Sequence, residues 1–95
     1  MSQQHATLLQ FFANWCYPCK VLTPIVNTVE TNMSDQLRVS RIDIDQEEDL
    51  ASRFHIMAVP TLVLIQDNQE IWRHTGVLSE HDLKTALGSA LSGKL

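Results

Sequence analysis

The sequence lacks any cluster of basic residues. It carries 7 Lys and Arg against 11 Asp and Glu, a formal net charge of −4, and the basic residues are scattered singly between Lys20 and Lys94. Nucleic acids and anionic membrane surfaces are bound by concentrated positive charge, so neither is an expected partner. Long apolar runs are also missing, because runs such as residues 62–65 are far shorter than a bilayer span. No basic segment precedes the first apolar residues, so we see no export signal and expect a cytoplasmic protein.

Linkers, internal repeats and low-complexity segments are absent too. No stretch rich in Gly, Pro or Ser divides the sequence, which has three glycines and three prolines. With 95 residues, of which 44 % are hydrophobic, the chain has the size and composition of one small globular domain. We therefore expect a single domain over residues 1–95 that acts as a monomer.

Cysteine is scarce, since Cys16 and Cys19 are the two in the sequence. A small secreted domain held by disulfides normally carries four or more, so that class is not expected. The spacing of the pair suits either a redox-active dithiol or half of a zinc or iron–sulfur site. A metal site needs further ligands, and none of the four histidines stands at ligand spacing from another Cys or His. We expect no metal and no cofactor, with a metal or iron–sulfur binding module as an alternative.

Hydrophobic periodicity predicts seven elements in the order β-α-β-α-β-β-α. Strands are expected at residues 6–13, 37–44, 61–66 and 70–75, the last two joined by a turn at 67–69. Helices are expected to start at the cysteines, at the acidic residues 47–49, and after Ser79. The strand-helix-strand start implies parallel pairing, whereas the later hairpin is antiparallel. The predicted fold is therefore α/β, with a four-stranded mixed sheet flanked by helices.

Cys16 falls where the first predicted strand meets the first predicted helix. Unpaired N–H groups at a helix start favour a negatively charged sulfur. A thiol with a pKa of about 8.5 is only about 3 % ionised at pH 7, whereas a pKa near 7 makes it about half thiolate. Cys16 is therefore the expected nucleophile. Cys19, one helical turn further on, is the expected resolving cysteine.

The residues around the cysteines indicate a site that meets a polypeptide. Pro18 fixes the backbone of the first helical turn and lacks a competing N–H donor. Trp15 and Tyr17 offer flat apolar surface beside the nucleophile, and Lys20 places a cation nearby. Ordinary partial burial of the two aromatic rings is the alternative.

The segment FFANWCYPCK, residues 11–20, resembles the active-site segment of thioredoxins. The resemblance covers nearly the whole chain in family order, continuing through Pro24, Asp43-Ile44-Asp45, Val59-Pro60-Thr61 and Gly76. It implies a thioredoxin-like fold and a thiol–disulfide oxidoreductase that exchanges its dithiol with disulfides of client proteins, as a reductant. The implied electron donor is a thioredoxin reductase, with glutathione as the alternative.

The resemblance also implies roles for three residues in the second half of the chain. Pro60 is expected to follow a cis peptide bond, to face the dithiol and to position the substrate. The backbone of Val59 is expected to form strand-like hydrogen bonds with an extended substrate, and Gly76 to permit its close approach. A non-catalytic adaptor that binds partners through this surface is a further alternative, although an adaptor needs neither cysteine.

The sequence departs from the family pattern in three places. Its first strand begins near residue 6, which leaves no room for the additional strand and helix of thioredoxins, so the minimal core shared with glutaredoxins is expected. Tyr17-Pro18 replaces the usual Gly-Pro, so the redox potential does not carry over. Gln10 stands at the position of a buried Asp, and Arg41 matches the Lys opposite it. We expect Gln10 and Arg41 to make contact beneath the dithiol and modulate it; the alternative places Arg41 in solvent at a sheet edge.

Overall fold

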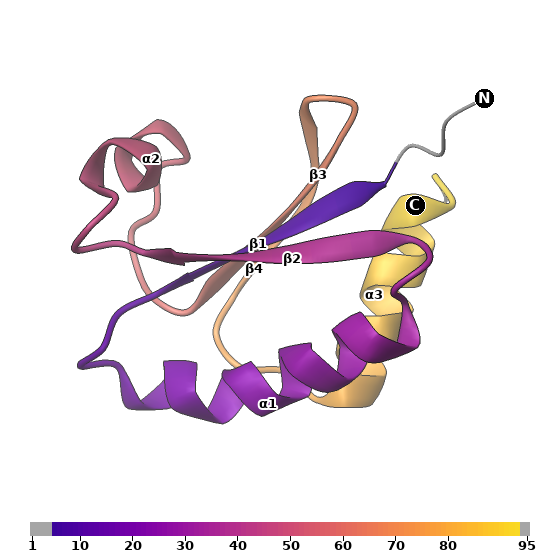
Figure 1. Cartoon of the computed structure of the whole chain (residues 1–95), viewed down its shortest axis with the longest axis horizontal. Coiled ribbons are helices and arrows are strands. Elements are labelled where there is room, and N and C mark those ends of the chain that lie inside the picture. Colours follow the sequence, from indigo (N-terminus) through magenta and orange to yellow (C-terminus); the bar gives the residue numbers. More distant parts are fainter. Residues whose placement is uncertain (1–4, 94–95) are drawn as a thin grey trace.

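The computed structural model describes residues 5–93 and has the predicted order of elements (Figure 1). The elements are β1 (Ala6–Phe12), α1 (Tyr17–Asn32), β2 (Leu37–Asp43), α2 (Glu48–Arg53), β3 (Thr61–Gln66), β4 (Gln69–Thr75) and α3 (Glu80–Leu91). The predicted boundaries agree to within a few residues. The largest difference in the hairpin is at its turn, which uses only Asp67 and Asn68, both with positive φ, so that Gln69 already belongs to β4.

The four strands form one mixed sheet in the order β2-β1-β3-β4, which confirms the predicted architecture. β1 pairs with β2 in parallel and with β3 antiparallel, and β3 pairs antiparallel with β4. Helices α1 and α3 lie on one face of the sheet, whereas the short α2 lies on the other face near one end (Figure 1). β1 and β3 are therefore the inner strands, and β2 and β4 are the edges.

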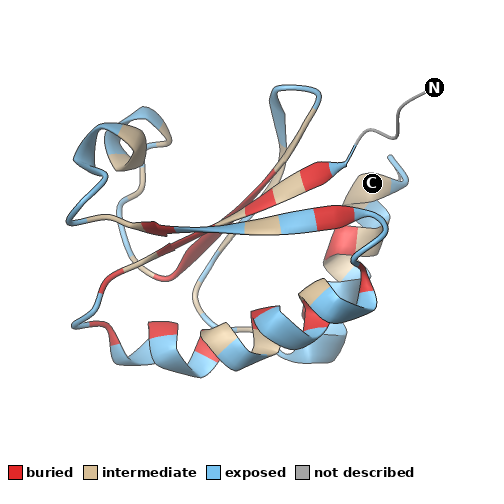
Figure 2. Ribbon diagram, in the orientation of Figure 1, coloured by how far each residue is buried: buried red, intermediate tan, exposed pale blue. Residues whose placement is uncertain are grey.

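The sheet separates two hydrophobic clusters, one on each face. Buried residues are found along β1 and β3 and on α1 and α3 (Figure 2). On the face of α1 and α3, Leu8 of β1 packs with Leu22 of α1 and Leu83 of α3, all fully buried. On the other face, Phe11 of β1 packs against Phe54, which follows α2, with ring centroids 5.7 Å apart. Alternate residues of β1 thus supply both cores, as expected for an inner strand covered on both sides.

Local interactions fix the later helices. Ser79 caps α3 as predicted, because its Oγ accepts a hydrogen bond from the Asp82 N–H at 3.0 Å. After α2, the carbonyl of Phe54 accepts a hydrogen bond from Arg73 of β4 at 2.7 Å. Arg73 also binds Glu70, and this hydrogen bond holds the pKa of the Glu70 carboxyl below its ordinary value. These contacts attach the end of α2 to the outer strand β4.

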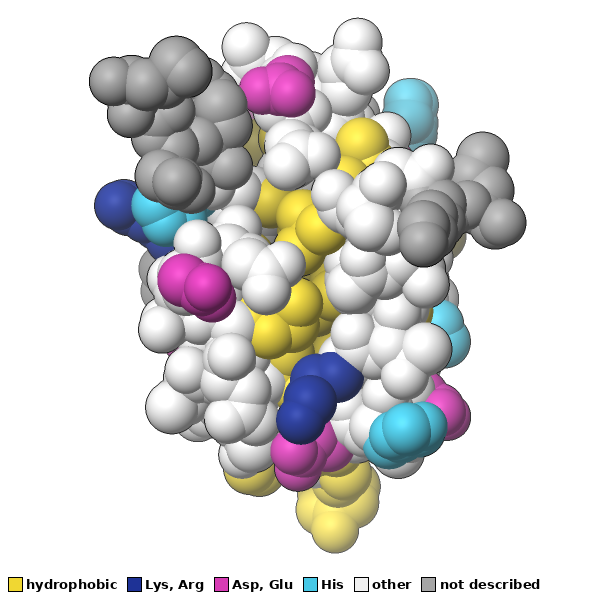
Figure 3. Space-filling view, turned by 90° about the vertical axis from the view of Figure 1, so that its right-hand side faces the viewer, with side chains coloured by type: hydrophobic (Ala, Val, Ile, Leu, Met, Phe, Trp, Pro, Cys, Tyr) yellow, Lys and Arg dark blue, Asp and Glu magenta, His cyan; other side chains and the backbone are white. Residues whose placement is uncertain are grey.

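The surface opposite the start of α1 shows charge scattered in both signs (Figure 3). Among the described residues in this view, single basic and acidic side chains stand beside a central strip of hydrophobic ones. Within the part of the chain that the structure describes, no helix combines the length and apolar content needed to cross a bilayer.

Candidate active site

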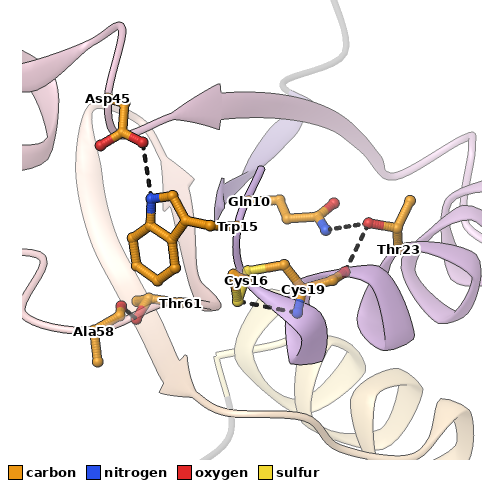
Figure 4. Close-up of a disulfide and its surroundings, with 8 residues drawn as sticks. All are labelled: Gln10, Trp15, Cys16, Cys19, Thr23, Asp45, Ala58 and Thr61. Carbon is orange, nitrogen blue, oxygen red and sulfur yellow. Dashed lines mark hydrogen bonds between the residues drawn. A yellow bond between two sulfur atoms is a disulfide. The ribbon is translucent and has the colours of Figure 1, made fainter. Parts of the chain in front are cut away.

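Cys16 and Cys19 form a disulfide at the N-terminus of α1 (Figure 4). Their Cα atoms lie 5.3 Å apart, and the residues are only 4 % and 3 % exposed. Ala13 is buried with them, and Ile44 and Val59 pack against the same cluster. The disulfide therefore lies where the ends of β1 and β2 meet the loop before β3.

The first turn of α1 gives Cys16 an environment that favours negative charge. Cys16 is the N-cap residue of α1, and its Sγ accepts a hydrogen bond from the Cys19 N–H at 3.2 Å. The N-terminal N–H groups and the helix dipole both stabilise an anion at this position. Pro18 stands in the first turn, where its missing N–H leaves no internal hydrogen bond unmade, and Lys20 is exposed one turn on. The geometry confirms the predicted helix start at the cysteines.

The loop before β3 brings the second half of the chain to the disulfide. The Val59–Pro60 peptide bond is cis, as the resemblance implied. The Pro60 carbonyl accepts a hydrogen bond from the Gly76 N–H at 2.9 Å, so Gly76 reaches the site from beyond β4. Gly76 has a φ of 103°, a conformation that glycine adopts most readily. Thr61 Oγ1 fixes the same loop by donating to the Ala58 carbonyl at 2.7 Å.

The two aromatic residues beside Cys16 are exposed. Trp15 and Tyr17 have exposed fractions of 70 % and 74 %, so the alternative of partial burial is wrong for both. The Trp15 indole Nε1 donates to Asp45 Oδ2 at 3.0 Å (Figure 4). Sequence reasoning missed this partner and took Asp45 only as part of a strand end. The signal available in the sequence was the predicted parallel pairing of β1 and β2. The segments that follow two adjacent parallel strands leave the sheet at the same end, so Trp15 and Asp45 are brought close together.

Asp45→Ala should release the Trp15 indole without unfolding the protein. An exposed hydrogen bond contributes about 1 kcal/mol or less, so the free energy of unfolding should fall by no more than that. The measurement is Trp15 fluorescence in a Trp72→Phe background, in which Asp45→Ala should change the emission and increase quenching by acrylamide. Asp45→Asn keeps a carbonyl acceptor and should resemble the parent. Identical spectra for Asp45→Ala and the parent would contradict the contact.

The predicted contact between Gln10 and Arg41 is wrong. Gln10 is fully buried and its Nε2 donates to Thr23 Oγ1 of α1 at 3.1 Å. Arg41 is exposed and donates instead to Asn27 Oδ1, also on α1. Gln10 and Arg41 are paired in the register of β1 and β2, so their side chains lie on the same face of the sheet. Gln10 lies on an inner strand, whereas Arg41 lies on the edge strand β2. The long Arg41 side chain reaches the outer side of α1, whereas Gln10 stays beneath the helix; the alternative of an exposed Arg41 is confirmed.

Metal ligands do not gather in the part of the chain that the structure describes. Across residues 5–93, no three Cys, His, Asp or Glu side chains form a group that could hold a metal ion. The two cysteines are bonded to each other.

A disulfide closed across two residues, at the start of a helix that follows the first strand of a mixed sheet, defines a thiol–disulfide oxidoreductase. The family model described as thioredoxin matches residues 1–89, and the chain belongs to the thioredoxin family.

Individual relatives agree with this assignment. The chain is 27 % identical over 90 residues to thioredoxin of Bacillus subtilis, covering 95 % of this chain and 86 % of that protein. It is 32 % identical over 76 residues to the bifunctional thioredoxin reductase/thioredoxin of Mycobacterium leprae, covering 80 % of this chain and 17 % of that protein. A solved mutant thioredoxin from Halobacterium salinarum superposes with a TM-score of 0.85 at 34 % identity, covering 93 % of this chain and 76 % of that one. The fold is thus thioredoxin-like.

Proposed function

We propose that the chain reduces disulfide bonds in client proteins, with Cys16 as the nucleophile and Cys19 as the resolving cysteine. The observation that carries the proposal is the hydrogen bond from the Cys19 N–H to Cys16 Sγ at the start of α1. Of the two sulfurs, that of Cys16 is the one at the N-cap, so it is the one the helix stabilises as a thiolate.

The exchange takes place in two displacements. In the reduced protein, the Cys16 thiolate attacks one sulfur of the client disulfide, forms a mixed disulfide and releases the other client sulfur as a thiolate. Cys19 then loses its proton, attacks Cys16 Sγ and releases the second client sulfur. Two electrons pass from the dithiol to the client, whose two sulfurs end as thiols after they take up the proton of Cys19 and one proton from solvent. Gln10 beneath the site is an amide and takes no proton, so the released client thiolate or solvent accepts the proton of Cys19.

Exposed apolar side chains around the disulfide support a protein client. The large exposed hydrophobic residues of the described chain are Trp15, Tyr17, Val21, Met57 and Val77. All of them are close in sequence to the cysteines, to Pro60 or to Gly76. We assign the client-binding surface to these residues together with Pro18, Val59, Pro60 and Gly76, with the Val59 backbone pairing to an extended client segment. Lys20 adds a positive charge beside it that favours the Cys16 thiolate.

A thioredoxin reductase is the proposed electron donor. One relative combines thioredoxin reductase and thioredoxin in a single chain, which supports such a pairing for this protein. We further propose that the chain works as a monomer, because every group in the two displacements comes from one copy. A reducing compartment such as the cytoplasm suits a protein that must return to its dithiol form.

Cys19→Ser should trap the client on the protein. Without the resolving thiol, the mixed disulfide at Cys16 accumulates because the second displacement cannot occur. With a disulfide-bonded substrate such as insulin, we expect a covalent adduct that is visible by mass spectrometry and lost on adding dithiothreitol. Cys16→Ser is the matched control and should form no adduct at a comparable rate. Trapping by Cys16→Ser but not by Cys19→Ser would reverse the two roles.

A further inference from the structure

The α2–β3 loop, residues 54–60, is held at both ends by β4 and the residue that follows it. At the start of the loop, the carbonyl of Phe54 accepts a hydrogen bond from Arg73 Nη2 at 2.7 Å. At its end, the carbonyl of Pro60 accepts a hydrogen bond from the Gly76 N–H at 2.9 Å. Arg73 and Gly76 are three positions apart, so one short stretch of chain fixes both ends of the loop relative to the sheet.

The bond from Arg73 acts at a strained turn of the loop. The Phe54 carbonyl belongs to the same peptide group as the nitrogen of His55, and His55 has a φ of 55°. This left-handed conformation is costly for a non-glycine residue and persists only when surrounding contacts hold it. The next amide, that of Ile56, donates back to the Ala51 carbonyl of α2 at 2.9 Å. Arg73 therefore supplies a polar connection from this turn to the sheet.

A β-bulge in β4 orients Arg73 for this contact. The pairing with β3 skips Ile71, which is an extra residue between Glu70 and Trp72. In a regular strand, residues three apart point to opposite faces, whereas the extra residue places Glu70 and Arg73 on the same face. Glu70 then accepts two hydrogen bonds, from Arg73 Nε at 2.8 Å and from Nη2 at 3.0 Å. This two-point contact holds the guanidinium toward the Phe54 carbonyl.

We propose that Arg73 is a positioning residue for protein clients: it holds the α2–β3 loop in the conformation in which the Val59 backbone pairs with an extended client segment. The inference rests on the proposed function, which assigns that pairing to Val59. Arg73 acts through the loop, so it contributes to client binding and to neither displacement at sulfur. A loop that is ordered beforehand spares the client the cost of ordering it. Without the anchor, a smaller fraction of molecules has the loop in the binding conformation, and the apparent affinity falls by that fraction.

Arg73→Ala tests the proposal by separating client binding from chemistry. The reduced protein, freed of reductant, is mixed with excess insulin, and the loss of its thiols gives a half-saturating concentration, equivalent to KM, and a limiting rate. Because one hydrogen bond of ordinary strength is lost, the half-saturating concentration should rise about fivefold while the limiting rate stays within about twofold of the parent. With hydroxyethyl disulfide, a small substrate that has no peptide backbone to pair with the loop, the variant and the parent should react equally fast.

Two further variants control for the change of charge. Arg73→Lys keeps a donor for the Phe54 carbonyl but loses the two-point contact with Glu70, so it should lie between the parent and Arg73→Ala. Lys84→Ala removes another exposed cation, which pairs with Glu80 of α3 at 3.9 Å, and should change neither parameter. An unchanged half-saturating concentration in Arg73→Ala, or an equal loss of rate with hydroxyethyl disulfide, overturns the proposal.

Amide hydrogen exchange measures the anchoring of the loop without a client. The N–H groups of His55 and Ile56 are hydrogen-bonded to Ser52 and Ala51, and in Arg73→Ala they should exchange about fivefold faster than in the parent. Unchanged exchange at both amides overturns the proposal whether or not the chain reduces insulin. Conversely, a parent that fails in the trapping experiment refutes the proposed function while the exchange rates still report on the anchor, so the two failures are distinguishable.

Discussion

Cys16→Ser is expected to lower the rate of protein-disulfide reduction by at least about a thousandfold, because a serine hydroxyl is hardly ionised at neutral pH and forms no disulfide. The helix N-terminus that stabilises a thiolate at Cys16 does not make an alkoxide accessible. Cys16→Ser should lower the rate of the chemical step without unfolding the protein, because Ser is a good N-cap residue for α1.

The measurement is insulin reduction coupled to NADPH oxidation through a thioredoxin reductase. Repeating the assay with dithiothreitol as the electron source distinguishes a failure of the reductase to reduce the chain from a failure of the chain to reduce insulin. A chain that is active with dithiothreitol and inactive with the reductase would refute the proposed donor only. Thr31→Ser, an exposed change at the far end of α1, is the control and should be fully active. Equal activity of Cys16→Ser and the parent would favour the adaptor alternative and remove the catalytic role.

Phe11→Ala is expected to lower the free energy of unfolding by about 3–5 kcal/mol, the range for removing a buried aromatic side chain. Phe11 is fully buried on the inner strand β1 and packs with Ile42, Val63 and the Phe54 ring. Among residues 5–93, the only helix on this face of the sheet is the short α2, so few side chains are available to fill the cavity.

Urea unfolding of the oxidised protein measures this loss. The midpoint should fall markedly in Phe11→Ala and less in Phe11→Leu, which keeps part of the apolar volume. Met57→Ala removes a side chain that is 92 % exposed and should change the free energy of unfolding by less than about 0.5 kcal/mol. A Phe11→Ala variant as stable as Met57→Ala would mean that the cluster around α2 adds nothing to stability.

The order of elements and the position of the cysteine pair could be predicted because their signals are local. Alternating apolar residues mark β2, and helical spacing of apolar residues marks α1 and α3. Ser79 and Asp82, three residues apart, predict the N-terminal cap of α3. Cys16 lies at the predicted junction of the first strand and the first helix. The turn at Asp67 was harder, because a two-residue turn with positive φ is decided by strand twist as well as by sequence.

The partners of the polar side chains could not be predicted in the same way. The strand register places Arg41 opposite Gln10. It does not determine which of the two side chains α1 covers, because that depends on where the helix crosses the sheet. The hydrogen bond between Trp15 and Asp45 joins residues 30 positions apart, and the hydrogen bond between Gln10 and Thr23 joins residues 13 positions apart on a strand and a helix. Such contacts are set by tertiary geometry, which the periodicity of a strand or helix does not encode.

The short span of the disulfide determines how oxidation affects the unfolded chain. A cross-link restricts an unfolded polypeptide in proportion to the logarithm of the loop it closes, and this one joins residues separated by three positions. The chain-entropy relation gives a stabilisation of about 2 kcal/mol for so small a ring, against about 4.7 kcal/mol for a loop of 100 residues. Oxidation and reduction therefore change the conformational freedom of the denatured ensemble by less than half of what a loop of 100 residues would, so opening the bond in each catalytic cycle removes only a small part of the constraint that a long-range disulfide provides.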